Sequence, residues 1–280
     1  LNADPNSVVF VRGATEGINL VARGLRLSKH DSVLVSIAEH HSNIAPWMRE
    51  AQLKFLRTSP TGPIDPVDLA NAIDLHRPKV FAVHHGANVT GVIQPVEALC
   101  RVAREKGVVT LVDASQSIPH LPIDVERIGC DFLAFSGHKM LGPKGVGVLW
   151  GRADMLDRLD ALCVGGGAIE SLTESRLVLR PPPEGLEAGT PNVSGAITLA
   201  AAMDYLEALG RNKVEEEAYA MSHLLREIVR NFSACSVLAS TQEFSLPIVT
   251  IVPPTDGPSA DRLAGMLSDG FGIMVRSGLH

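Results

Sequence analysis

The chain has 280 residues, of which 45% are hydrophobic and 20% are charged, and its formal net charge at pH 7 is −6. A chain of this length can bury a sizeable core, and this composition is typical of ordinary globular proteins. The acidic balance argues against a nucleic-acid-binding surface, and no apolar run reaches the length of a membrane span.

The four cysteines (Cys100, Cys130, Cys163 and Cys235) are widely separated and form no CxxC pair. This pattern favours reduced, mostly structural thiols in a cytoplasmic protein, without a metal site. The N-terminal residues show no signal-peptide pattern. The first residue is leucine, an apolar strand follows almost at once, and the last residue comes directly after a strand-like run at 271–276. We therefore expect the chain to be part of a longer protein.

Compact apolar runs alternate with helical patterns along the first 150 residues. The runs predict strands at 8–11, 31–36, 53–56, 79–83, 108–113, 131–135 and 146–150. Strands that alternate with helices predict an α/β fold with a mainly parallel sheet and crossover helices. Because these strands are almost continuously apolar, we expect helices to cover both faces of the sheet.

The later part of the chain changes character. Residues 163–192 are rich in glycine and proline and are expected to form a long irregular segment, and such segments are often functional or interfacial. Helical patterns follow at 193–209 and 213–231. Strands are then predicted from 236, at 247–252 and at 271–276, with a helix at 259–267. We predict a large domain over 1–210 and part of a small α+β domain over 211–280.

The strand at 131–135 leads into Ser136, Gly137, His138 and Lys139. A lysine just past a buried strand is costly unless its charge is paired or its pKa is depressed. A desolvated lysine suits Schiff-base chemistry, because the free amine is the nucleophile. An ordinary surface turn with a solvated lysine is the alternative at this point. The glycines at 137 and 142 have phosphate-loop spacing, but Pro143 stands where that loop needs lysine, so a hairpin is predicted instead.

Other strand ends also carry polar groups. Thr15 stands in a small-residue turn between the first strand and a helix, an arrangement that binds anions, although an ordinary N-cap explains it equally well. Asp113 ends an apolar strand, where open α/β sheets bind ligands. His40 lies at a strand-to-helix junction and could stack on a bound ring or be part of a polar turn. A phosphate clamp, an acid and a desolvated lysine together match the needs of pyridoxal phosphate.

The sequence also resembles the class V aminotransferase-like, fold-type I pyridoxal-phosphate enzymes, most closely the branch of cysteine desulfurases and selenocysteine lyases. The matching segments occur in family order over nearly the whole chain: Arg12–Asn19, Glu39–Asn43, Asn88–Gly91, Leu111–Gln116, Phe135–Pro143, Glu187–Asn192 and Val275–His280. The resemblance implies a seven-stranded, three-layer αβα large domain and a homodimer.

It also implies roles for individual residues. The catalytic group would be the Schiff-base lysine Lys139, the pyridinium partner Asp113 and the stacking acid or base His40. The residues that would bind the cofactor are Ala14, Thr15, His40, Asn88, Asp113, Gln116, Ser136, His138, Lys139 and Thr190. Thr190 would reach the phosphate of the neighbouring subunit, and Asn88 and Arg276 would bind the substrate. Ala14 stands where relatives carry a hydroxyl.

The activity implied is removal of sulfur from L-cysteine, giving alanine and an enzyme persulfide, with a sulfur-acceptor protein and iron–sulfur cluster assembly as the context. In this branch the persulfide cysteine follows the Arg-Ser-Gly-x-His run, so we expect it directly after His280. None of the four cysteines present matches it, and full turnover by these residues alone is not expected. The alternatives are a selenocysteine lyase, an aminotransferase-like lyase, or a relative that binds the cofactor without catalysis.

Overall fold

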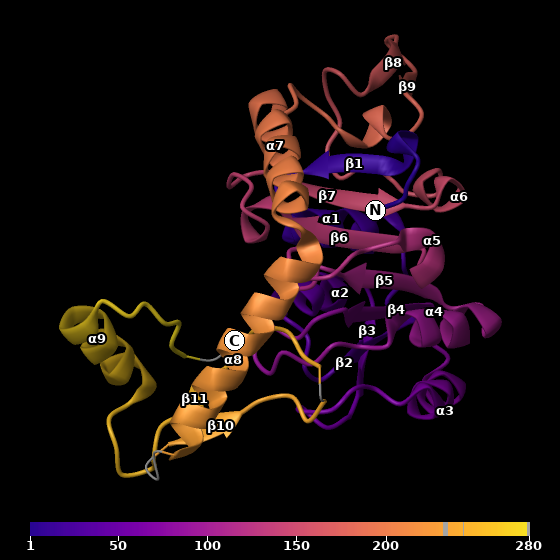
Figure 1. Ribbon diagram of the computed structural model, residues 1–280. Helices are drawn as coiled ribbons and strands as arrows, with labels where there is room; N and C mark the ends of the chain where they lie inside the picture. The colour runs from indigo at the N-terminus through magenta and orange to yellow at the C-terminus, as the bar shows by residue number, and fades with distance from the viewer. Residues whose placement is uncertain (232–234, 243, 279–280) are drawn as a thin grey trace.

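The computed structural model describes residues 1–231, 235–242 and 244–278. Its main sheet has seven strands in the order β1-β7-β6-β5-β4-β2-β3 (Figure 1). Strand β7 runs antiparallel to both of its neighbours, and the other pairs are parallel. The strands are β1 (Val8–Val11), β2 (Ser32–Ser36), β3 (Gln52–Leu56), β4 (Val80–His84), β5 (Val109–Asp113), β6 (Phe132–Ser136) and β7 (Gly147–Gly151). The predicted mainly parallel sheet is confirmed.

Two buried hydrophobic clusters lie on opposite faces of this sheet, because successive side chains of a strand point to opposite sides. Val33 and Val35 belong to one cluster and Leu34 to the other. The helices that contribute to the first are α1 (Ala14–Gly24), α2 (Ala45–Glu50) and α6 (Ala153–Leu156). Those on the other face are α3 (Pro66–His76), α4 (Val96–Glu105), α5 (Val125–Ile128) and α7 (Val193–Leu209). The three-layer arrangement follows from this burial on both faces.

Strands β6 and β7 are joined through the short helix η3 (Gly137–Lys139) and form the predicted hairpin. Gly147, the first residue of β7, lies between the end of β6 and the turn before α1. A Cβ at Gly147 would lie 2.5 Å from the Phe135 carbonyl oxygen and 2.6 Å from the Gly13 Cα. Such distances exclude any larger residue, so this glycine lets the turn before α1 approach the end of β6.

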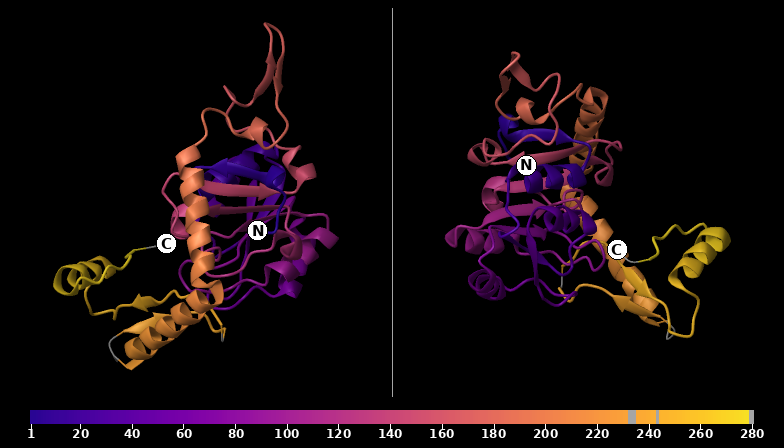
Figure 2. Two further views of the ribbon diagram at one scale, coloured as in Figure 1. Left: turned by 45° about the horizontal axis from the view of Figure 1, so that its top comes forward. Right: turned by 180° about the vertical axis from the view of Figure 1, so that it is seen from behind.

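The glycine- and proline-rich stretch is less irregular than its composition predicts. It contains an antiparallel hairpin of β8 (Ile169–Leu172) and β9 (Leu177–Leu179), followed by the short helix η4 (Glu184–Leu186). The hairpin projects away from the main sheet (Figure 2). Its side chains are largely exposed, so no core periodicity marks these strands in the sequence.

After α7 the chain continues in α8 (Arg211–Asn231), β10 (Ser236–Leu238), β11 (Thr250–Val252) and α9 (Ala260–Phe271), and α9 stands apart from the sheet (Figures 1 and 2). The predicted strand at 271–276 is wrong. Phe271 ends α9, Gly272 caps the helix in the left-handed conformation with φ 66°, and residues 272–277 have no regular structure. An apolar run forms a strand only where a neighbouring strand can pair with it.

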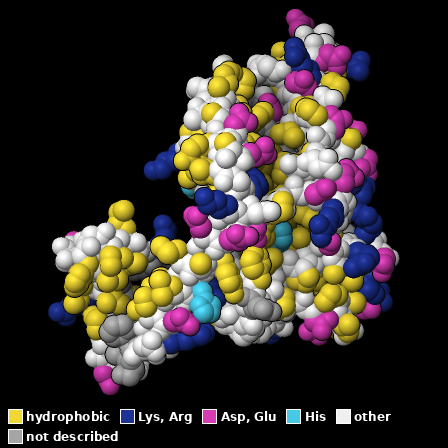
Figure 3. Space-filling view, in the orientation of Figure 1, with side chains coloured by type: hydrophobic (Ala, Val, Ile, Leu, Met, Phe, Trp, Pro, Cys, Tyr) yellow, Lys and Arg dark blue, Asp and Glu magenta, His cyan; other side chains and the backbone are white. Residues whose placement is uncertain are grey.

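The boundary at 210/211 stays a prediction. It falls at Gly210, which separates α7 from α8 with φ 80°. Hydrophobic side chains gather on the surface of α8 and α9 (Figure 3), among them Met221, Leu225 and Met266. Within the described ranges, no helix combines the length and apolar character needed to cross a membrane.

Candidate functional site

The site forms at the carboxyl ends of the central strands. Asp113 ends β5 and is 7% exposed, and Ser136 ends the neighbouring strand β6 and is 8% exposed. Asp113 is in register with His84 of β4 on one side and with Ala134 of β6 on the other. The Ser115 N–H donates to Asp113 Oδ1 over 2.9 Å, which fixes the carboxylate. The sequence therefore placed these two residues correctly at one edge of the sheet.

The turn before α1 lies against Ser136. Gly13 is the N-cap of α1, and the Ala14 N–H donates to Ser136 Oγ over 2.9 Å. A Cβ on Gly13 would lie 3.1 Å from the same hydroxyl oxygen, so a larger residue there would crowd the serine. The first N–H groups of α1 and the Ser136 hydroxyl thus form a small cradle at the positive end of a helix dipole, which suits an anion.

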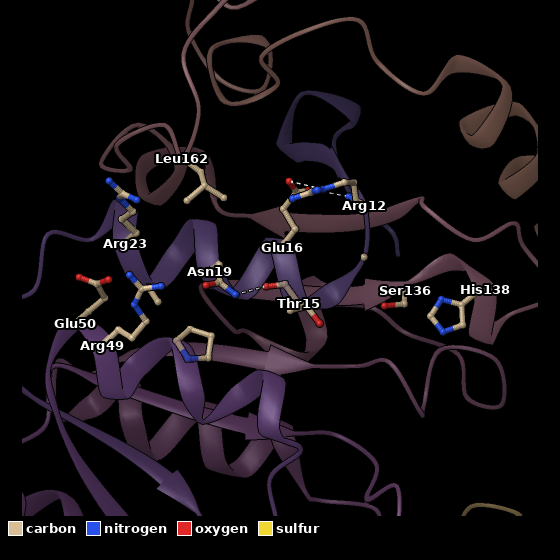
Figure 4. Close-up of a pocket in the computed structure, with 13 residues that line it drawn as sticks. Arg12, Thr15, Glu16, Asn19, Arg23, Arg49, Glu50, Ser136, His138 and Leu162 are labelled. Carbon is tan, nitrogen blue, oxygen red and sulfur yellow. Dashed lines mark hydrogen bonds and ion pairs between the residues drawn. The ribbon is translucent and has the colours of Figure 1, made fainter. Parts of the chain in front are cut away.

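A cavity of about 530 Å³ opens beside this cradle (Figure 4). Gly13, Thr15, Ser136 and His138 line one end of it. The Thr15 and Ser42 hydroxyl oxygens lie 2.8 Å apart, so the turn after β2 contacts the start of α1. The structure therefore brings together three of the predicted phosphate ligands, Thr15, Ser136 and His138. The cavity continues along α1 to Arg23 and Glu50, and Asp113 is not among the residues that line it.

Lys139 is half-buried at the end of η3. Burial lowers the pKa of its amine, the Asp113 carboxylate opposes this, and the Arg276 guanidinium adds to the lowering. A lysine whose charge is desolvated carries a larger fraction of neutral amine, which is the nucleophilic form. This matches the desolvated lysine predicted from the sequence, and it also places the exposed Arg276 within electrostatic range of Lys139.

His40 is the N-cap of the short helix η2 (His41–Asn43), and its Nδ1 accepts the Ser42 N–H over 3.1 Å. In a neutral ring this contact puts the proton on Nε2. Gln116 and Asn88 are half-buried on the loops after β5 and β4. A Cβ built on Gly86 would lie 3.5 Å from the Gln116 Cβ, so these two loops are adjacent.

Thr190 lies between η4 and α7 and not at the end of a strand of the main sheet. It is exposed, and the preceding residue, Gly189, is bonded through its N–H to the Gly166 carbonyl. No hydrogen bond among the described residues joins Thr190 to the Thr15 cradle. This placement is compatible with the predicted role in a neighbouring subunit, which stays a prediction.

Sequence reasoning missed a buried polar cluster beside the site. Glu39 is fully buried, and its Oε1 lies 2.7 Å from His84 Nδ1. Burial alone raises the pKa of Glu39, but the His84 imidazole and the hydrogen bond from Asn43 outweigh it and hold the pKa below its ordinary value. The available signal was a glutamate directly before the helix-opening histidines and a histidine ending an apolar strand, because buried ionisable groups need partners.

Comparisons with known proteins agree with this geometry. The family model of aminotransferase class-V matches residues 1–280. A probable cysteine desulfurase of Xylella fastidiosa is 36% identical over the whole chain, which covers 68% of that protein. A probable cysteine desulfurase of Methanothermobacter thermautotrophicus is 35% identical, again over the whole chain, with 70% of the relative covered.

The fold agrees as well. The apo structure of cysteine desulfurase from Thermococcus onnurineus NA1 superposes with a TM-score of 0.91 at 34% identity, covering 99% of this chain and 70% of that one. The cysteine desulfurase CsdA from Escherichia coli gives a TM-score of 0.88 at 28% identity, covering 98% of this chain and 69% of that one. With the lysine, the acid and the anion cradle at one sheet edge, these matches show that the chain belongs to the class V aminotransferase family of pyridoxal-phosphate enzymes.

Proposed function

We propose that the chain binds pyridoxal 5′-phosphate and acts on L-cysteine as a cysteine desulfurase. The observation that carries the cofactor assignment is the juxtaposition of a desolvated amine with an acid and an anion cradle. The cradle fits a phosphate, because Gly13 leaves the space that a Cβ would fill and the N-terminus of α1 faces it. The Lys139 pKa is lowered by burial, as a covalent anchor for an aldehyde requires.

Different residues would bind the phosphate, the ring nitrogen and the ring hydroxyl of the cofactor. The hydroxyls of Thr15 and Ser136 would hold the phosphate, with His138 adding a further contact, and the Ala14 N–H would orient the Ser136 hydroxyl to which it donates. Asp113 would bind the protonated ring nitrogen, and Gln116 would reach the ring hydroxyl. When bound, pyridoxal phosphate withdraws electrons from the α-carbon of an amino-acid substrate. Each charge-assisted hydrogen bond at such a site contributes about 1.5–3 kcal/mol.

Two residues are suited to move protons. Lys139 is a general base when its amine is neutral, and burial favours that form. His40 would lie over the cofactor ring, and its Nδ1 already accepts the Ser42 N–H, so Nε2 is the atom that would give up or take a proton. Arg276 and Asn88 would bind the substrate carboxylate, since Arg276 lies within electrostatic range of Lys139.

Release of sulfur requires a thiol that accepts it. Cys100 and Cys130 are poor candidates, because burial raises the pKa of Cys100 to about 12 and that of Cys130 well above its ordinary value. Both also lie near Asp131, which precedes β6, whereas Asp113 and Ser136 lie at the opposite ends of β5 and β6. The balanced reaction is L-cysteine plus a thiol giving alanine plus a persulfide, and an added thiol would complete it.

The partners and location are part of the same proposal. We expect a homodimer in which Thr190 reaches the neighbouring cofactor, a sulfur-acceptor protein that supplies iron–sulfur cluster assembly, and a place in the cytoplasm. The unpaired state of all four cysteines supports a reducing compartment. The exposed position of Thr190 supports the dimer.

The experiment is a product assay on the chain loaded with pyridoxal phosphate. L-cysteine and dithiothreitol are added, and alanine and sulfide are measured against time. Equal amounts of both products, lost in Lys139→Ala, support the proposal. Matched Lys144→Ala, an exposed lysine nearby, should retain both. Transfer of the amino group to a keto acid, or alanine from selenocysteine alone, would instead support the aminotransferase-like or selenocysteine-lyase alternatives. Cofactor binding without any product would support a non-catalytic relative.

A further inference from the structure

The buried cluster around Glu39 is a chain of hydrogen bonds. Groups that can only donate lie at its outer ends, so the donor and acceptor of each bond can be assigned. On one side, the Ile64 backbone N–H donates to Gln94 Oε1 over 2.8 Å. A backbone N–H can only donate, so this contact fixes which end of the Gln94 amide is oxygen. The Gln94 amide nitrogen then faces His84 Nε2 at 3.2 Å and must donate to it. His84 therefore uses Nε2 as an acceptor and carries its proton on Nδ1, which donates to Glu39 Oε1 over 2.7 Å.

The hydrogen bonds through Asn43, on the other side of Glu39, also point toward the carboxylate. The Trp47 indole N–H, again only a donor, meets Asn43 Oδ1 at 3.3 Å, so the Asn43 amide nitrogen donates to Glu39 Oε2 over 2.8 Å. The Ser36 hydroxyl accepts the Ala38 N–H at 3.2 Å and donates to Glu39 Oε1 at 2.8 Å. All three side chains around Glu39 thus point donors at it, so the O–H of a carboxylic acid would find no acceptor among them, whereas a carboxylate needs none.

The charges near His84 favour a protonated ring, whereas the hydrogen-bond directions favour a neutral one. Burial lowers its pKa, whereas Glu39 and, more weakly, Asp113 raise it, with a net effect upward. The remaining neighbour is His85, whose own pKa burial lowers to about 4, so it is neutral. A second proton on His84 would need Nε2, where the Gln94 amide already donates. Turning that amide would place its NH₂ group against the Ile64 N–H, so the hydrogen-bond directions decide for a neutral ring. Glu39 is then held ionised by the hydrogen bonds it accepts from His84, Asn43 and Ser36, and not by a positive charge on His84.

The position of Glu39 gives this cluster a role. Glu39 directly precedes His40, and its contacts with Ser36 and Asn43 span the turn that presents His40. Its third partner, His84, sits in register beside Asp113. One buried carboxylate therefore ties the element that carries the predicted ring-stacking histidine to the strand next to the predicted ring-nitrogen acid.

We propose that Glu39 is a positioning residue for the cofactor ring, kept permanently ionised by a one-way chain of donors that runs from Ile64 through Gln94 and a neutral His84. The proposal rests on the proposed cofactor role of His40 and Asp113. It adds a specific protonation state, which a purely structural cluster would not require.

The first test reads protonation directly on the chain without cofactor. Two-bond ¹H–¹⁵N spectra of histidine-labelled protein at pH 6–8 should show His84 with Nδ1 protonated and Nε2 bare; His84→Asn assigns the signals. Gln94→Glu should reverse this, because its second oxygen would accept a proton from Nε2 and make the ring an imidazolium. A doubly protonated wild-type ring at pH 7, or no change in Gln94→Glu, overturns the proposal.

The second test measures positioning. Glu39→Gln puts an NH₂ group among the converging donors, so we expect pyridoxal-phosphate affinity to fall about tenfold and the circular dichroism of the bound cofactor to change. The exposed control Glu105→Gln should do neither. Unchanged dichroism and affinity in Glu39→Gln contradict the positioning role. If wild type binds no cofactor, the proposed function fails, while the spectra still decide the protonation state.

Discussion

Ser136 links two elements through one hydroxyl, because it accepts the buried Ala14 N–H at 2.9 Å. Ser136→Ala would leave that N–H without its acceptor, and an unsatisfied buried donor costs about 1–3 kcal/mol. We expect a loss of that size in the free energy of unfolding, measured with denaturant in the absence of cofactor. Ser268→Ala, at an exposed site on α9, should change it little. Equal effects of the two substitutions would show that the cradle is not held by this bond.

Lys139 gives a prediction about pH. Its pKa is lowered in the folded protein by burial, so between the folded and unfolded pKa values the unfolded chain binds more protons. The folded state is therefore penalised at pH 7 and gains stability as the pH rises toward the unfolded value near 10.5. We expect Lys139→Met to stabilise the chain at pH 7 and to have a smaller effect at pH 9.5, by denaturant unfolding. An advantage that stays constant with pH would contradict the desolvated lysine.

Three of the predicted site residues share one property. Asp113 and Ser136 end apolar strands and Lys139 comes soon after one, and neighbouring parallel strands bring their carboxyl ends to one edge of the sheet, so local patterns were sufficient to group these three. Glu39 and His84 were missed as a pair because they are 45 residues apart and their contact depends on β2 and β4 being neighbours. Strand order is a property of the whole sheet, and no local pattern encodes it.

The loop after β4 packs closely against the segment around Leu246. Gly91 has φ 73°, and a Cβ there would lie 2.8 Å from the Leu246 carbonyl oxygen. Gly145 has a similar φ of 77° but nothing within 4 Å of such a Cβ. Both glycine-to-alanine substitutions pay for the left-handed backbone. Only Gly91→Ala also forces two backbones apart, so it should cost about 1–3 kcal/mol more.

Thermal and denaturant unfolding of the two variants measure this difference. A matching loss in both would mean that the segment around Leu246 moves away without cost. The Leu246 N–H donates to the Gly91 carbonyl, and Arg226 of α8 donates to the Leu246 carbonyl, so the structure predicts the opposite.

Two secondary-structure predictions differ from the structure: the strand expected at 271–276 and the irregular segment that contains β8 and β9. Residues 271–276 are apolar and β-branched enough to suggest a strand, but in the part of the chain that the structure describes they pair with no strand, and Gly272 caps α9 instead. The hairpin of β8 and β9 was missed for the converse reason. Its residues pair with each other and leave most of their side chains exposed, so neither alternation nor an apolar run marks them.

At the scale of the whole molecule, the predicted dimer connects Thr190 to the site of a neighbouring subunit. If this is correct, Thr190→Ala should weaken pyridoxal-phosphate binding about tenfold, because a hydrogen bond to a charged phosphate is lost. The loss should occur only at protein concentrations where sedimentation shows a dimer. Thr255→Ala, at an exposed loop, is the control. A loss that persists in the monomer would place Thr190 in its own subunit's site.

Lys139 is proposed to anchor pyridoxal phosphate just after β6. The most direct measurement is to add the cofactor, reduce the complex with borohydride, and identify the modified lysine by mass spectrometry. We expect a visible absorption band that borohydride removes, a cofactor label on Lys139, and neither band nor label in Lys139→Ala. A label on another lysine, or a band that survives in Lys139→Ala, would contradict it.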